Sequence, residues 1–120
     1  MEEKILMNVE FPYLYRDAGN WKKSGAIVFT NPERLSLAEA QVRLIAACER
    51  SLADLNWFIP ELVGLEPLRE GWDIDLDGPW HELLADLRET EASPTDRRTL
   101  REFVLQFEQA GLKQWLATTP

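Results

Sequence analysis

Residues 5–15 read Ile-Leu-Met-Asn-Val-Glu-Phe-Pro-Tyr-Leu-Tyr, and residues 25–30 read Gly-Ala-Ile-Val-Phe-Thr. β-Branched and aromatic residues favour strands, and the second run stops at Asn31-Pro32. Between the two runs, Asp17-Ala-Gly-Asn20 supplies residues that tolerate the left-handed backbone of a turn. The two runs therefore predict a β-hairpin with a wide loop, in which Pro12 marks an edge or a bulge.

Two helices are expected after this hairpin. Ser36-Leu-Ala-Glu39 and Thr99-Leu-Arg-Glu102 both match a capping box, in which a hydroxyl and a carboxylate satisfy free amides at a helix start. Apolar residues recur at helical spacing after each of them. We therefore predict one helix over 37–55, ending near Asn56, and a second one that Gly111 ends or bends.

The segment between the helices is less regular. Residues 57–79 mix large apolar side chains with Pro and Gly, which predicts an ordered loop packed on the core. Residues 80–90 fit either a helix or a strand, and the strand would bury His81, Leu83, Ala85 and Leu87 on one face.

The strand interpretation gives one α+β domain over residues 1–120. Its element order is ββαβα, and its three-stranded antiparallel sheet carries two helices on one face. The alternative fold makes 80–90 a third helix.

Composition limits the class of protein. The chain has 120 residues, of which 45% are hydrophobic, enough for one domain with its own core. No apolar run approaches the length of about 20 residues that a membrane span needs, and the first residues lack the basic start of a signal peptide. A lone cysteine, Cys48, cannot form an internal disulfide, which suits a reducing compartment. We therefore expect a cytoplasmic protein that does not bind membranes.

The charge is strongly negative and unevenly placed. The chain carries 21 acidic and 13 basic residues, a net charge of −8. Segment 61–96 holds 11 acidic residues against Arg69 and Arg88, a net of −9. Such a segment repels nucleic acid and attracts a basic protein surface or cations, and it also keeps a small protein soluble.

A motif covers the hairpin: Tyr13-Leu-Tyr15-Arg16-Asp17-Ala-Gly-Asn20-Trp21-Lys22, followed by Gly25-Ala-Ile-Val-Phe29. With Trp80-His81-Glu82 and Pro94-Thr95-Asp96, the chain resembles a loose group of small, functionally uncharacterised bacterial proteins. These open with a Tyr-Arg-Asp-x-x-Asn-aromatic-Lys hairpin. In that group the Trp-His-Glu segment leads into a strand, so the resemblance favours a strand over 80–90 and the order ββαβα. It implies no chemistry.

The hairpin loop is one candidate site. A cluster of polar groups with an aromatic residue suits a ligand or a partner protein, and here it consists of Arg16, Asp17, Asn20, Trp21 and Lys22. The alternative is structural: Asp17 caps the loop, Arg16 pairs with an acid, and Trp21 packs under the turn.

An acidic repeat is a second candidate. Asp73-Ile-Asp75-Leu-Asp77-Gly78 matches the first half of a calcium loop, whose oxygen ligands converge around a turn. Position 12 of such a loop falls on Leu84, however, and Glu82 comes two residues early. We therefore expect no metal or cofactor and an exposed acidic loop, with Asp73, Asp75, Asp77 and Glu82 as the ligands of the metal alternative.

Catalytic candidates are few. His81 is the only histidine and adjoins Glu82, so general-base chemistry is one alternative. No nucleophile or oxyanion site accompanies it, and Cys48 falls in the middle of the predicted helix, on its buried face, where thiols are inert.

The sequence thus favours a non-enzymatic interaction protein that binds a basic partner protein through 61–96 or the Trp21 loop, as small immunity or antitoxin proteins do. The alternative is a small cation-binding module or hydrolase centred on the carboxylates Asp73, Asp75, Asp77 and Glu82 and on His81. Composition leaves self-association open.

Overall fold

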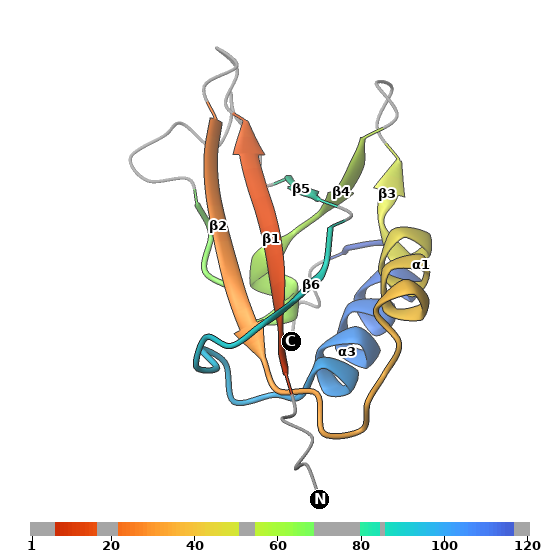
Figure 1. The fold of residues 1–120 in the computed structure, drawn as a ribbon. Helices are drawn as coiled ribbons and strands as arrows, with labels where there is room; N and C mark the ends of the chain where they lie inside the picture. Colours follow the sequence, from red (N-terminus) through yellow and green to blue (C-terminus); the bar gives the residue numbers. More distant parts are fainter. Residues whose placement is uncertain (1–6, 17–21, 51–54, 69–79, 85, 117–120) are drawn as a thin grey trace, which may run out of the picture.

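The computed structural model describes residues 7–16, 22–50, 55–68, 80–84 and 86–116. Its elements, in chain order, are β1 (Asn8–Arg16), β2 (Lys22–Phe29), α1 (Leu37–Ala47), β3 (Glu49–Arg50), β4 (Asn56–Phe58), the 3-10 helix η1 (Pro60–Val63), β5 (His81–Leu83), β6 (Arg88–Thr90) and α3 (Leu100–Leu112). Figure 1 shows the β1–β2 hairpin on one side of the molecule and α1 and α3 packed side by side on the other, with β3 directly beyond the end of α1.

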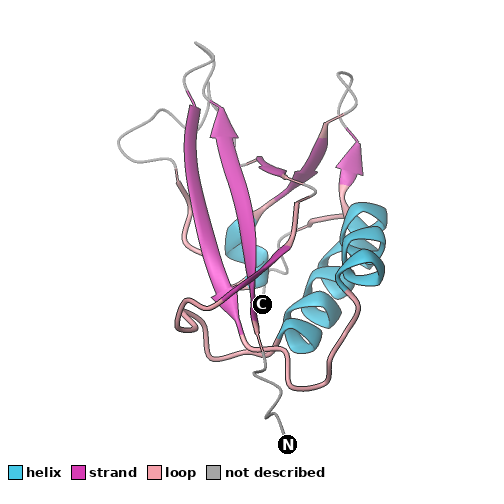
Figure 2. Cartoon of the chain, viewed as in Figure 1, coloured by secondary structure: helices cyan, strands magenta, loops and turns pink. Residues whose placement is uncertain are grey.

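The strands form one antiparallel sheet in the order β2-β1-β5-β4-β3, and β6 also pairs with β1. The α+β class and the two α-helices of the described chain confirm the prediction (Figure 2). The predicted three-stranded sheet is wrong, since the described residues form six strands. Residues 57 and 58 belong to β4 rather than to a loop, and β3 was not expected at all.

The hairpin dominates the sheet. β1 and β2 pair without interruption from Val9 opposite Phe29 to Arg16 opposite Lys22. Residues along β1 alternate between half-buried and buried, as expected for a strand with one face against a core. The hairpin prediction is confirmed, although β2 begins at Lys22, three residues before the predicted start.

Within 80–90 the described residues form two short strands rather than a helix, and both strands pair with the second edge of β1. β5 pairs Leu83 with Tyr13, whereas β6 pairs Arg88 with Glu10. The four positions between Leu83 and Arg88 therefore stand opposite only two residues of β1, which is a bulge. Pro12 is one of those two residues, and because it has no N–H to donate, it fits this break in the ladder.

The first helix is shorter than predicted. α1 ends at Ala47, and Cys48 is already extended, with φ −71° and ψ 155°. The chain then forms β3, in which Glu49 pairs with Trp57 of β4. Pairing to the sheet thus overrides the helical spacing that continues to residue 55, and Cys48 lies at the end of the helix rather than in its middle.

The second helix begins where its capping box predicted. The Thr99 side chain accepts from the Glu102 amide, and the Glu102 side chain accepts from the Thr99 amide. α3 continues through Gly111 to Leu112. No helix in the described part of the chain is long and apolar enough to cross a membrane.

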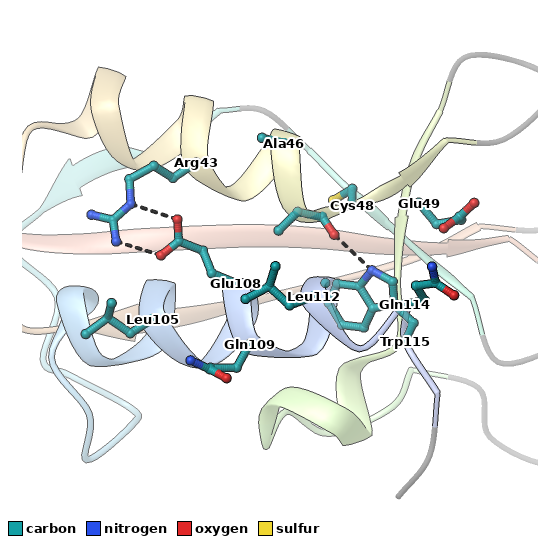
Figure 3. Close-up of a pocket in the computed structure, with 12 residues that line it drawn as sticks. Arg43, Ala46, Cys48, Glu49, Leu105, Glu108, Gln109, Leu112, Gln114 and Trp115 are labelled. Atoms are coloured by element: carbon teal, nitrogen blue, oxygen red, sulfur yellow. Dashed lines mark hydrogen bonds and ion pairs between the residues drawn. The ribbon is translucent and has the colours of Figure 1, made fainter.

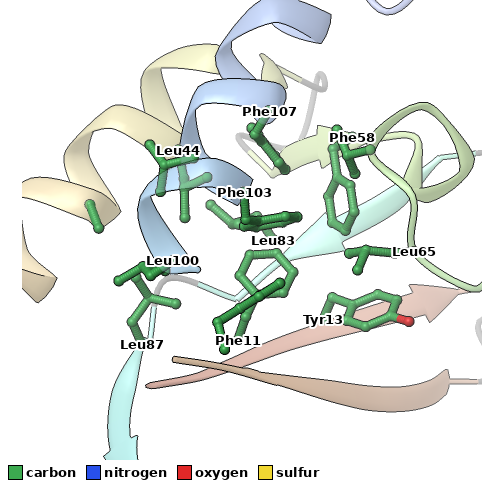
Figure 4. Packing of buried hydrophobic residues seen from close by; sticks show 14 of the residues in the cluster. Phe11, Tyr13, Leu44, Phe58, Leu65, Leu83, Leu87, Leu100, Phe103 and Phe107 are labelled. Atoms are coloured by element: carbon green, nitrogen blue, oxygen red, sulfur yellow. The ribbon is translucent and has the colours of Figure 1, made fainter. Parts of the chain in front are cut away.

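The core lies between the hairpin and the helices, as Figure 4 shows. Phe103 of α3 stacks on Phe29 with ring centroids 4.5 Å apart, and it meets the edge of Phe11 at 5.0 Å. Phe107 packs against Phe58 of β4 at 5.3 Å. One face of the sheet is therefore filled by helix side chains, which leaves the opposite face to present other residues.

Candidate functional site

The candidate site lies on the sheet face that points away from the helices. Leu14 of β1 pairs with Glu82 of β5, and Glu82 pairs with Trp57 of β4. Residues directly opposite each other in a sheet point to the same side. Three neighbouring strands therefore place Leu14, Glu82 and Trp57 side by side. Positions two residues along a strand, or paired with them, share this side. We call the surface formed by Leu14, Glu82, Trp57, Arg16, Lys22 and Trp80 the open sheet face.

An ion pair anchors this row. Arg16 Nε donates to Glu82 Oε2 at 2.5 Å. The Glu82 carboxylate is buried, with only 7% of its side chain exposed, whereas 34% of the Arg16 side chain remains exposed. The expectation that Arg16 pairs with an acid is confirmed. The guanidinium holds one of the oxygens that the metal alternative assigned to a cation.

Two tryptophans stack beside the ion pair. Trp57 and Trp80 lie with ring centroids 5.8 Å apart and an interplanar angle of 24°. Both are half-buried. The contact of Trp57 with Glu82 could not be predicted from the sequence, because local spacing does not encode the register of β4 on β5.

His81 points the other way. Neighbouring residues of a strand face opposite sides of the sheet, so His81 and Glu82 do not share a site. His81 is fully buried; its Nε2 accepts a hydrogen bond from the Leu68 amide at 3.0 Å. Its ring lies 4.6 Å from that of Tyr15. The histidine thus serves as a hydrogen-bond acceptor inside the core.

Two of the three motifs noted in the sequence contact each other in space. Tyr15 packs on His81, while the next residue, Arg16, pairs with Glu82 across the same two strands. Tyr13, two positions earlier, donates its hydroxyl to the Glu66 carbonyl at 2.8 Å. Burial, and secondarily the charge of Glu66, raises the pKa of this phenol. The Tyr-Arg and Trp-His-Glu segments therefore form one structural cluster.

The Pro94-Thr95-Asp96 segment is held in place by hydrogen bonds to β2 and to Arg98. The Thr95 amide donates to the Val28 carbonyl, and the Thr95 hydroxyl accepts from the Val28 amide, both at 2.9 Å. Asp96 accepts from the Arg98 side chain at 2.8 and 3.0 Å. This hydrogen bonding lowers the pKa of the Asp96 carboxyl below its ordinary value.

Cys48 has no sign of reactivity. The thiol is half-buried, and burial raises its pKa to about 12. The nucleophilic thiolate is therefore scarce at neutral pH.

The other predicted site residues divide into two sets. Lys22 is exposed at the start of β2, opposite Arg16. Six lie outside the described residues: Asp17, Asn20, Trp21, Asp73, Asp75 and Asp77. In the ranges that the structure describes, no three His, Cys, Asp or Glu side chains gather in a way that could hold a metal ion.

Comparison with known proteins gives no relative: no family model, no curated protein and no solved structure matches this chain.

Proposed function

We propose that the protein is a non-enzymatic, cytoplasmic interaction protein that binds a partner protein with a basic surface. The acidic segment 61–96 provides the attraction, and the adjoining open sheet face and Trp21 loop provide the contact. The observation that carries this proposal is the internal use of the reactive side chains. His81, Glu82 and Cys48 are each engaged in packing or hydrogen bonding rather than offered to a substrate.

Charge supports the same conclusion. Segment 61–96 has a net charge of −9, and its described carboxylates at Glu61, Glu66, Glu89 and Glu91 are exposed. An acidic surface attracts a basic partner over several ångströms and speeds encounter, which is how electrostatic complementarity acts in protein recognition.

The open sheet face adds aromatic contact area. Tryptophan and arginine are the residues most often dominant in protein interfaces. Trp57, Trp80 and Arg16 lie together there, each only partly buried. By analogy of size and charge alone, such a surface suits a small immunity or antitoxin protein that neutralises a basic protein.

The test begins with recovery of a partner by tagged pull-down at low and high salt, followed by binding titrations with that purified partner. Asp73→Asn, Asp75→Asn and Asp77→Asn combined should weaken binding at least tenfold and flatten its salt dependence. The matched control removes three exposed acids elsewhere, as Glu33→Gln, Glu39→Gln and Glu102→Gln; glutamine at 102 keeps the helix cap. Equal losses in both variants, or no loss in the first, would contradict the proposed interface.

A second experiment, thermal melting with added metal ions, tests the cation-binding alternative. Melting curves with Ca²⁺, Mg²⁺, Mn²⁺ or Zn²⁺ should coincide with the metal-free curve under our proposal. A ligand at about 100 times its dissociation constant adds about 2.7 kcal/mol, which is several degrees for a domain of this size. A shift of that size, lost in the triple Asn variant, would favour the cation-binding module instead.

A further inference from the structure

The large apolar side chains exposed in the described chain all come from α1, α3 and the residues directly after α3. They are Val42 (67% exposed) on α1, Leu105 (44%) and Leu112 (80%) on α3, and Leu116 (67%) in the turn that follows. Single exposed leucines are ordinary, but a group confined to one face of two neighbouring helices marks an interaction surface.

Exposed residues without charge recur at helical spacing along both helices. On α1, Ala38, Val42 and Ala46 are exposed and stand four residues apart, so they form one stripe. On α3, Leu105, Gln109 and Leu112 form a second stripe. Each helix thus exposes apolar side chains on its outer face in addition to those that pack into the core, with Glu39 and Arg101 beside them. Apolar side chains on an outer helix face are normally covered by another surface.

A groove of about 480 Å³ separates the stripes at the end of the helix pair, and Figure 3 shows Leu105 and Leu112 beside it. The Trp115 indole closes one end and donates to the Ala47 carbonyl at 3.0 Å. The surface therefore offers projecting leucines and a hollow side by side.

The charges within this surface cancel. Arg43 donates to both carboxylate oxygens of Glu108, at 3.0 and 2.7 Å, across the two helices (Figure 3). Around this pair, the exposed acidic residues Glu39 and Glu49 are balanced by the basic residues Arg101 and Lys113. In a chain with a net charge of −8, this patch therefore carries no net charge of its own.

We propose that this surface, the helix face (Val42, Ala46, Leu105, Gln109 and Leu112), is the interface of a homodimer. A two-fold interface uses the same patch on both copies, so that patch needs projections and a complementary hollow at once. Homodimer interfaces are also more apolar than those of transient partners. A basic partner gains no charge attraction from a neutral patch, whereas a second acidic copy meets no net repulsion there.

The dimer is tested by light scattering and sedimentation over a concentration series. The wild-type chain should approach twice its mass of 13.9 kDa as concentration rises. Leu105→Lys with Leu112→Lys should raise the dissociation constant at least tenfold. Lysine is a good helix former, so these exposed substitutions leave the fold intact, which circular dichroism verifies.

The matched control places two lysines on exposed positions elsewhere, as Ser24→Lys with Ser93→Lys, and it should dimerise like the wild type. A wild-type chain that stays monomeric at every concentration would overturn the proposal. A dimer insensitive to the Leu105 and Leu112 changes would also overturn it.

Salt separates this inference from the proposed function. Salt screens repulsion between two acidic copies, so dimerisation should strengthen as ionic strength rises. Binding of a basic partner should weaken under the same change. If the two leucine substitutions weaken capture of that partner while the wild-type chain stays monomeric, the helix face belongs to the partner and the dimer is wrong.

Discussion

Arg98 connects three parts of the molecule through one guanidinium. It lies over the rings of Phe103 and Phe29, 5.1 and 5.7 Å from their centroids. It also donates to the Val63 carbonyl at 2.6 Å and to Asp96 at 2.8 Å. Cation–π contacts and charge-assisted hydrogen bonds are each stronger than their neutral counterparts. This side chain therefore ties η1 to the start of α3 and to β2.

Replacement of Asp96 by Asn should lower the free energy of unfolding by about 1 to 3 kcal/mol at neutral pH, because the charged acceptor of Arg98 is lost. The pKa of Asp96 is lowered in the folded state. Its contribution is therefore present above the unfolded pKa and disappears as pH falls through the folded pKa. Urea denaturation of both proteins should show the difference shrinking in acid.

Asp86→Asn is the matched control for that measurement. Asp86 also pairs with an arginine two positions away, Arg88, but more than half of each side chain is exposed. Exposed ion pairs contribute about 0 to 1 kcal/mol. A cost for Asp86→Asn equal to that of Asp96→Asn would contradict the role given to burial.

His81→Phe should test the histidine as a core acceptor. Phenylalanine keeps an aromatic ring among Tyr13, Tyr15 and Phe58, but leaves the Leu68 amide without its acceptor. An unsatisfied buried amide costs about 1 to 3 kcal/mol. His81→Ala should cost more, since it also removes the packing. Chemical denaturation that ranks the two variants in the reverse order would refute this role.

At the scale of elements, the sequence predicts those elements whose formation depends on neighbouring residues. The β-branched and aromatic runs with turn residues between them identify the hairpin, and the capping residues Ser36 and Thr99 identify both helix starts. β3 to β6 are only two or three residues long, too short for alternation to show. β5 and β6 pair with β1, β4 pairs with β5, and β3 pairs with β4, so each depends on a strand distant in sequence or on another short strand.

The candidate site likewise has one feature that could be predicted from the sequence and others that could not. An acidic partner for Arg16 could be predicted from its residue type, because a strand-end arginine beside a buried sheet needs a counter-charge. Its identity could not, since Glu82 lies 66 positions away and reaches Arg16 only through the register of β1 on β5. The Trp57 and Trp80 stack depends on a second register, that of β4 on β5.

Gly111→Ala should destabilise the protein, against the usual trend for helices. An alanine normally stabilises a helix by up to about 1 kcal/mol relative to glycine. Here the added Cβ would lie 2.6 Å from the Ala47 carbonyl oxygen, so α1 and α3 would have to move apart. We expect a cost of about 1 to 3 kcal/mol, measured by thermal unfolding. Ser93→Ala, at an exposed loop position away from both helices, should stay within about 0.5 kcal/mol of the wild type.

At the scale of the whole molecule, like charges oppose the compact state. A net charge of −8 on 120 residues means that folding brings carboxylates closer together. The melting temperature should therefore rise as salt is added at low ionic strength, because screening weakens this repulsion.

Glu89→Gln with Glu91→Gln checks the source of that effect. Both side chains are exposed in or beside β6, within the acidic segment. Removing their charge should raise the melting temperature in low salt and reduce its response to added salt. A melting temperature that falls instead would mean that these carboxylates stabilise the fold.

The position of β1 between partners that are near and far in sequence sets the order in which the chain can fold. β1 pairs with β2, which follows it closely in the sequence, whereas Tyr13 of β1 pairs with Leu83, which is 70 residues further along the chain. Local contacts form fast, and distant ones carry a larger cost of loop closure. During synthesis the hairpin is therefore complete while the other edge of β1 stays unpaired until Thr90 has been made. That interval is when the nascent chain is most exposed to aggregation through a free strand edge.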